Sequence, residues 1–246
     1  IFFSISSNLC FGSGVVKYLD GRVIHKKDEM KKPQKKDWKK LKKILKIKEF
    51  VPNDKAMEMA DFMYSDSVSP GLKEGVRIWE ADSIFIADQL EKINEGKIKS
   101  LFENKLDMEL GIGITGHSLG ATTAAQVCLN DKRFVCGINM DGGTYGEYLR
   151  KDIKKPFMLI ATRSVANVSR TTFLYNSQDT YMTIINGTKH ISYSDLLFIA
   201  RQLNIVNVLG KRDKFDTHEI YTNYHLKFFG KYLLRNNEIE LKDLNY

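Results

Sequence analysis

Hydrophobic and polar positions along the chain fall into two repeating patterns. Short, mostly apolar runs bounded by turn residues are typical of buried strands, and longer segments with apolar residues three to four positions apart are typical of helices. The first pattern predicts strands over 1–6, 111–115, 134–140, 156–162 and 181–185. The second predicts helices over 74–94, 119–129 and 217–235. Strands that alternate with helices indicate an α/β fold with a largely parallel sheet.

The segment between the first strand and the first long helix is different. Residues 14–24 read GVVKYLDGRVI and predict a hairpin with Asp20-Gly21 at its turn. We interpret residues 26–73 as a lysine-rich insertion or irregular segment, and we expect 52–71 to be irregular. The whole chain, residues 1–246, is interpreted as a single domain.

Composition adds one local feature to this picture. Of 246 residues, 43% are apolar and 28% are charged, which is ordinary for a folded globular protein and excludes a disordered or collagen-like chain. The formal net charge is +8, but residues 22–48 hold 13 basic and three acidic residues. The remaining chain has 25 basic and 27 acidic residues, so one segment carries the entire excess.

This basic segment has three interpretations. It is a solvated surface, a peripheral contact of Lys26–Lys48 with an anionic membrane, or a nucleic-acid contact. Residues 39–48 predict a basic amphipathic helix with Trp38, Leu41 and Leu45 on one face. The segment lacks interleaved aromatic residues, and the chain has no zinc-finger spacing, so we expect no nucleic-acid partner. The sequence contains no run of 18 apolar residues, so it predicts no transmembrane helix within the chain.

The cysteines do not indicate a metal site or a disulfide framework. Cys10, Cys128 and Cys136 form no C-x-x-C pair, and their number is odd. We therefore expect no metal and no cofactor.

The strongest chemical signal is Gly116-His117-Ser118-Leu119-Gly120, which matches G-x-S-x-G. It follows a predicted strand and opens a predicted helix, which is the context of a nucleophile elbow. Such a turn projects the serine hydroxyl at the carboxyl edge of the sheet. The N–H of Leu119, at the helix amino terminus, is then placed to stabilise an oxyanion.

A nucleophilic serine needs a base, which follows it in the chain order Ser, acid, His. His190 follows a predicted strand through a short loop and is the preferred base; His117 lies in the elbow and is expected to point away from the hydroxyl. His25 precedes the serine, and a packing or surface role is the default for His218 and His225.

The acid follows by elimination. Residues 155–178 contain no Asp or Glu, so the acid cannot directly follow the strand at 156–162. Asp141 ends the preceding strand and is the preferred acid. Asp179 is the second candidate, and a simple turn or helix-capping aspartate is the alternative interpretation of Asp141.

The segment GHSLGATTAAQVCLNDKRFVCGINMDGG resembles the elbow-to-acid region of the group II (plasma-type) platelet-activating factor acetylhydrolases and their bacterial relatives. Gly187 to His190 resembles the loop that carries the family's base. The resemblance is good from about residue 74 to 195 and weak before that. It implies an α/β-hydrolase fold and a serine esterase with Ser118, Asp141 and His190 as its triad. The implied substrates are small esters with short acyl groups or acetylated phospholipids.

Two departures from the family pattern matter. Ala121 stands where the family has a second glycine, which narrows the space beside Ser118. An oxyanion hole also takes a second donor from a loop after an earlier strand. No such loop is visible because residues 1–6 resemble the strand that follows it. We therefore expect that the amino-terminal part of the domain is missing and that this chain has impaired activity.

Three alternatives stay open. GHSLG also occurs in acyltransferases of fatty-acid synthesis, but Ala121 and the lack of a GQG segment argue against that class. Class 3 lipases share GHSLGG, but the spacing to Asp141 fits them less well. The third alternative is a degenerate hydrolase scaffold that binds lipid or a protein partner. The sequence does not assign a compartment.

Overall fold

The structure, a computed structural model, describes residues 2–6, 15–17, 23–25, 35–47, 49–199, 209–242 and 244–245. Its strands are β1 (Phe2–Ser6), β2 (Val15–Lys17), β3 (Val23–His25), β4 (Ile112–His117), β5 (Phe134–Met140), β6 (Phe157–Ala161), β7 (Thr180–Ile184) and β8 (Leu244–Asn245). Its helices are α1 (Lys35–Ile44), α2 (Asn53–Tyr64), α3 (Pro70–Asn94), α4 (Leu119–Asn130), α5 (Arg163–Ser169), α6 (Leu196–Ile199) and α7 (Lys214–Tyr232). Two 3-10 turns, η2 (Arg170–Phe173) and η3 (His190–Tyr193), complete the described elements.

Six of the described strands form one sheet in the order β1-β4-β5-β6-β7-β8, and every neighbouring pair is parallel. The predicted strands are confirmed, and β5 has the predicted bounds. Because all these strands run the same way, their carboxyl ends lie at one edge of the sheet. The loops that follow β4, β5 and β7 therefore meet at that edge.

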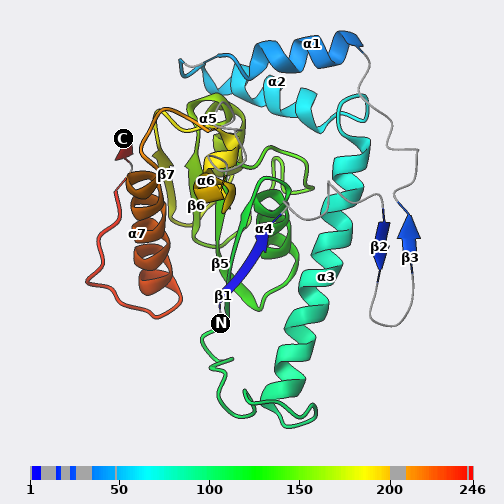
Figure 1. The fold of residues 1–246 in the computed structure, drawn as a ribbon, viewed down its shortest axis with the longest axis vertical. Coiled ribbons are helices and arrows are strands. Elements are labelled where there is room, and N and C mark those ends of the chain that lie inside the picture. Colours follow the sequence, from blue (N-terminus) through cyan, green and yellow to red (C-terminus); the bar gives the residue numbers. More distant parts are fainter. Residues whose placement is uncertain are drawn as a thin grey trace.

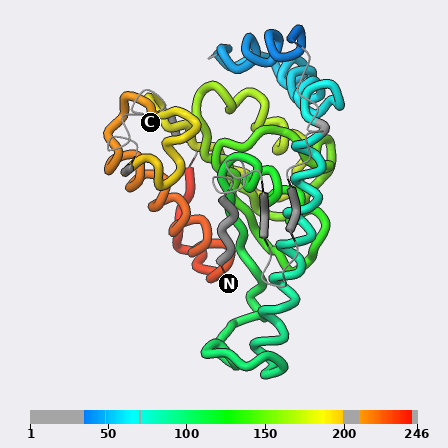
Figure 2. The backbone as a smooth tube through the Cα atoms, turned by 45° about the vertical axis from the view of Figure 1, so that its right-hand side comes forward, coloured from blue at the N-terminus to red at the C-terminus, as the bar shows by residue number. Residues whose placement is uncertain are grey.

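Helices cover both faces of this sheet (Figure 1). On one face α7 packs Phe228 and Phe229 against Ile138 of β5 and Met158 of β6. On the other face the small residues of α4, including Ala124 and Ala125, pack against β4, and Ala87 of α3 joins them. Figure 2 shows α7 and α3 on opposite sides of the sheet in a second view. The expected parallel sheet flanked by helices is confirmed.

The segment before α3 differs from the expected irregular structure. Residues 53–64 form α2, so the prediction for 52–71 is wrong. The buried positions of α2 are alanine and methionine rather than large aliphatic residues, which weakens the sequence signal. They still fall on one stripe, where Ala56, Ala60 and Met63 are buried. This stripe packs against α1 and against Val168 of α5.

The basic helix is present but begins earlier than predicted. It spans 35–44 rather than 39–48, and its buried residues are Leu41 and Ile44. Leu45 packs against the same cluster, whereas the Trp38 side chain is about half exposed (48%). The apolar face of α1 is therefore largely used inside the protein.

The predicted hairpin is confirmed for its strands, since β2 and β3 pair antiparallel. Its Asp20-Gly21 turn lies outside the described residues, as does Cys10. Within the described part of the chain, no helix has the length and apolar character needed to span a bilayer. That residues 1–246 form a single domain stays a prediction.

Candidate active site

The turn between β4 and α4 is built around a close approach of two backbones. A Cβ atom on Gly116 would lie 2.2 Å from the carbonyl carbon of Gly120, so only glycine fits at position 116. Ser118, between them, has φ +59° and ψ −119°, a left-handed backbone that non-glycine residues rarely adopt. Its N–H donates to the carbonyl of Met140 at 3.0 Å, which fixes the turn to β5. This is the strained serine turn that the motif predicts.

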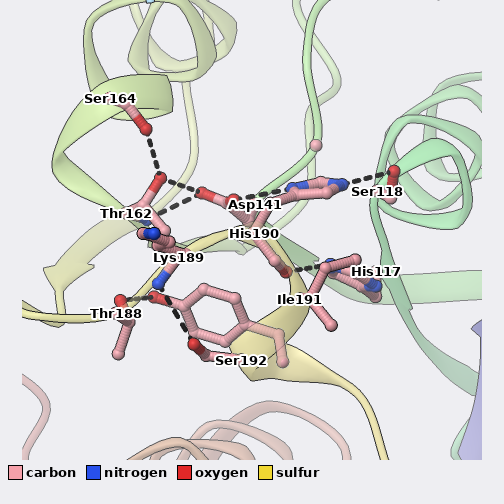
Figure 3. Close-up of polar contacts among 12 residues, drawn as sticks. His117, Ser118, Asp141, Thr162, Ser164, Thr188, Lys189, His190, Ile191 and Ser192 are labelled. Atoms are coloured by element: carbon pink, nitrogen blue, oxygen red, sulfur yellow. Dashed lines mark hydrogen bonds and ion pairs between the residues drawn. The ribbon is translucent and has the colours of Figure 1, made fainter. Parts of the chain in front are cut away.

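The three predicted side chains meet at the carboxyl edge of the sheet. His190 Nε2 lies 2.9 Å from Ser118 Oγ, and His190 Nδ1 lies 2.8 Å from Asp141 Oδ2. Figure 3 shows Ser118, His190 and Asp141 in a row. The Asp141 carboxylate is fully buried, whereas the His190 ring is about half exposed (45%). One ring nitrogen thus faces a buried carboxylate and the other faces a hydroxyl, which is the geometry in which an imidazole can accept the serine proton.

A residue that sequence reasoning missed completes the environment of Asp141. Thr162 donates to Asp141 Oδ1 twice, from its N–H at 2.7 Å and from its hydroxyl at 2.8 Å. The hydroxyl of Ser164 lies 3.0 Å from that of Thr162 and continues the chain (Figure 3). The oxygen that faces His190 is therefore fixed in direction by hydrogen bonds to the other oxygen. The sequence did hold a signal for this contact. Thr162 directly follows β6, Asp141 directly follows β5, and these two strands are neighbours in the sheet.

Ala121, which replaces a glycine of the family pattern, is accommodated by a glycine elsewhere. A Cβ on Gly142 would lie 2.6 Å from Ala121 Cβ and 2.6 Å from the Ser118 carbonyl oxygen. The methyl group of Ala121 thus occupies space that the missing side chain of Gly142 leaves free. The space that Ala121 takes up beside Ser118 is thus offset by the lack of a side chain on Gly142, just after β5.

Leu119 is the first residue of α4, so its N–H belongs to the first turn, whose donors have no partner within the helix. β4 lies between β5 and β1, and the register of β1 with β4 places Ser6 opposite His117. Residues 7–14, which follow β1, lie outside the described residues. The expectation that the second oxyanion donor is lacking therefore stays a prediction.

His218, His225 and Asp179 do not take part in this row. His225 Nδ1 donates to the carbonyl of Tyr221 at 2.6 Å, and its Nε2 lies 3.0 Å from Thr115 Oγ1, a packing role inside the protein. The ring of His218 contacts those of Phe198 and Tyr221. Asp179 precedes β7 and accepts a hydrogen bond from Tyr232 at 2.7 Å, at the opposite end of that strand from His190. Asp141, not Asp179, is therefore the carboxylate beside the imidazole.

The cysteines described by the structure are not activated. Cys128 and Cys136 are buried and free. Burial raises the pKa of the Cys128 thiol to about 12, and it also raises the pKa of the Cys136 thiol. Within the described residues, no group of three or more His, Cys, Asp or Glu side chains is placed to hold a metal ion.

Arg133, which directly precedes β5, has a structural role in the described fold. Its guanidinium binds Asp131 at 2.6 Å, Asp88 at 2.7 Å and Glu91 at 3.1 Å. These contacts join the start of β5 to α3 and leave Arg133 at the opposite end of β5 from Asp141.

A serine turn on a parallel sheet, with an imidazole and a carboxylate supplied by the following strands, defines the α/β-hydrolase class. The structure is similar to that of a ferulic acid esterase from Streptomyces cinnamoneus, with a TM-score of 0.59 and 18% identity over 93% of this chain and 59% of that one. This likeness shows the shared fold.

The particular family follows from the sequence comparisons. The family model described as platelet-activating factor acetylhydrolase, isoform II, matches residues 88–244, and the chain belongs to this family. A platelet-activating factor acetylhydrolase of Cavia porcellus is 25% identical over 161 residues, which cover 58% of this chain and 37% of that protein. The chain thus spans little more than a third of the length of this relative.

Proposed function

We propose that this chain is a serine ester hydrolase in which Ser118, His190 and Asp141 form the catalytic triad. The observation that carries this proposal is the continuous row from Ser118 Oγ through His190 to the buried Asp141 carboxylate, with distances of 2.9 and 2.8 Å. Ser118 attacks the ester carbonyl while His190 Nε2 takes the hydroxyl proton. His190 then returns that proton to the leaving alcohol, and water releases the acyl group by the same route.

Asp141 and Leu119 have supporting roles in this mechanism. Asp141 accepts from His190 Nδ1–H, which holds the ring in the tautomer that exposes the Nε2 lone pair to Ser118. The charge of the imidazolium that forms during the reaction is stabilised by the same carboxylate. The N–H of Leu119 binds the oxyanion at the amino terminus of α4.

The proposed substrates are small esters with short acyl groups, including acetylated phospholipids of the platelet-activating-factor type. Support comes from family membership and from the name of the Cavia porcellus relative. A metal ion or cofactor has no part in this mechanism, since the serine, imidazole and carboxylate supply the nucleophile and both proton-transfer steps.

Two assays on the purified chain test the proposal. The first is labelling of Ser118 by a fluorophosphonate probe, which reacts with an activated serine. The second is hydrolysis of p-nitrophenyl acetate by the wild type, by Ser118→Ala and by a control variant at the exposed Ser67, Ser67→Ala. We expect labelling and turnover in the wild type and in the control, and neither in Ser118→Ala. A folded wild type that neither reacts with the probe nor hydrolyses the ester would contradict the proposal and favour a scaffold that only binds lipid or a partner.

We also propose that Lys26–Lys48 contacts anionic membrane surfaces peripherally. Within this segment α1 carries six lysines and one acid, Asp37. Its partner α2 contacts α5 and η2, which follow the carboxyl end of β6. The lysines of α1 thus lie at the same end of the molecule as α5, near the carboxyl ends of the strands (Figure 1). Because Leu41 and Ile44 are buried, the contact is electrostatic and does not insert the apolar face of α1.

A further inference from the structure

We infer that His117, the second residue of the elbow, is a positioning residue that fixes the base His190 by a hydrogen bond to its main-chain carbonyl. This inference rests on the proposed function, in which His190 takes the serine proton. His117 Nε2 lies 2.8 Å from the carbonyl oxygen of His190 (Figure 3). A carbonyl oxygen only accepts, so the Nε2 atom of His117 carries the hydrogen.

The contact joins two segments that the chain keeps 73 residues apart. His117 ends β4 and adjoins the nucleophile, whereas His190 opens the 3-10 turn η3. Since the side chain of His190 faces Ser118 and its carbonyl faces His117, neighbouring elbow residues bind both ends of the base. A rotation of η3 that moved the imidazole away from Ser118 would also break the bond to His117.

Ring packing supports the same placement. The ring of His117 lies 4.6 Å from that of His190 and 6.3 Å from that of Tyr193, measured between centroids. His190 and Tyr193 are the first and last residues of η3, so His117 contacts both ends of this turn. Tyr193 is buried and its hydroxyl is 3.1 Å from Thr188 Oγ1, which anchors the turn from its other side.

The protonation state of His117 fits a neutral donor. Burial lowers the pKa of His117 to about 4, and the nearby charge of His190 acts in the same direction. His117 therefore remains neutral when His190 becomes an imidazolium. No positive charge on His117 then opposes proton transfer to His190. Within the described residues, Nδ1 of His117 is buried and has no hydrogen-bond partner. A buried nitrogen without a hydrogen-bond partner is unusual in a folded protein. The bond that Nε2 donates to His190 gives a reason for a histidine at this position.

The test compares a substitution that removes the donor with one that returns it. His117→Leu removes the donor at similar volume, and His117→Gln places an amide N–H near the position of Nε2. On p-nitrophenyl acetate we expect kcat of His117→Leu to fall by about tenfold to a hundredfold with little change in KM, because small displacements of a catalytic group have such effects. We expect His117→Gln to recover most of that loss.

Histidine NMR supplies a readout that does not depend on turnover. In the wild type we expect His117 to be neutral and protonated at Nε2 above pH 6. We also expect the proton on His190 Nδ1 to be visible in the wild type and in His117→Gln, and to be lost or broadened by exchange in His117→Leu.

Two results would overturn the inference while leaving the proposed function intact. One is a folded His117→Leu protein with wild-type kcat and an unchanged His190 proton. The other is protonation of His117 at Nδ1 in the active wild type. If the wild type proves inactive toward ester and probe, the proposed function fails, and the NMR comparison still decides whether His117 fixes His190. If neither variant folds, the wild-type tautomer alone decides.

Discussion

Thr162 binds a single oxygen of the Asp141 carboxylate with both its main-chain N–H and its hydroxyl, at 2.7 and 2.8 Å. The other oxygen is left to His190 Nδ1. Thr162 is 98% buried, so water does not compete for these bonds. The orientation of the carboxylate toward the imidazole thus depends on a residue of the neighbouring strand end.

Replacing the Thr162 hydroxyl tests this dependence. Thr162→Val keeps the N–H and nearly the same shape but removes one donor, and Thr162→Ser returns it. A hydrogen bond to a charged group contributes about 1.5–3 kcal/mol, of which part acts in the transition state, so we expect kcat of Thr162→Val to fall by about tenfold. Steady-state kinetics on p-nitrophenyl acetate measure this effect. Equal kcat values for the two variants would mean that the hydroxyl does not orient Asp141.

The two candidate acids can be separated by matched substitutions. Asp141→Asn leaves an amide beside His190 Nδ1, which favours the wrong tautomer, and we expect kcat/KM to fall by about three to four orders of magnitude. Asp179→Asn changes a carboxylate that binds Tyr232 and should leave kcat/KM within about twofold of the wild type. The assignment of Asp141 would be wrong if Asp179→Asn caused the larger loss in a folded protein.

The sequence predicted the parts of the site that depend on local order. G-x-S-x-G is a contiguous motif, and the order of serine, acid and histidine along the chain restricts the candidates strongly. The strands β4 to β7 were also predictable because each is a short apolar run between turns. Parallel pairing then brings their carboxyl ends, and hence Asp141 and Ser118, to one edge.

The contacts that orient these side chains were not predictable in the same way. Thr162 reaches Asp141 only through the register of β5 and β6, and His117 reaches His190 only after η3 docks on the elbow. These are distances in space that no local pattern encodes. The α2 helix was missed for another reason, since its buried face consists of alanine and methionine, which form a weak apolar stripe.

Two histidines whose pKa is lowered in the fold predict a dependence of stability on pH. Burial lowers the pKa of both His117 and His225 to about 4, against about 6.5 in an unfolded chain. The unfolded state therefore binds more protons between these values. The free energy of unfolding should be greatest above pH 6.5 and should fall as pH decreases toward 4, by on the order of 3 kcal/mol for each histidine.

Urea unfolding at a series of pH values measures this slope. His225→Gln removes one of these two titrating groups and should reduce the slope between pH 4.5 and 6.5. Carboxylates with lowered pKa, such as Asp131, lose their contribution at lower pH, which separates the two effects. Equal slopes for the wild type and His225→Gln would show that His225 does not cause the decrease.

The lysines of α1 should govern membrane association without affecting ester hydrolysis. The test uses two variants, each with four Lys→Gln changes at exposed positions. The first set, on α1, is Lys35, Lys36, Lys39 and Lys43. The control set, near the far end of α3, is Lys92, Lys97, Lys99 and Lys105. The two sets remove the same charge, so a difference between them reports the position of the lysines.

We expect the α1 set to weaken co-sedimentation with phosphatidylserine vesicles by about a hundredfold or more, because each lysine near an anionic surface contributes about 1 kcal/mol. The control set should weaken binding much less than the α1 set. Vesicles of phosphatidylcholine alone should bind neither the wild type nor the two variants. Turnover of p-nitrophenyl acetate should be unchanged in both, since none of these lysines contacts the row from Ser118 to Asp141. If the two sets weaken binding equally, net charge alone attracts the protein. If neither does, α1 is a solvated surface.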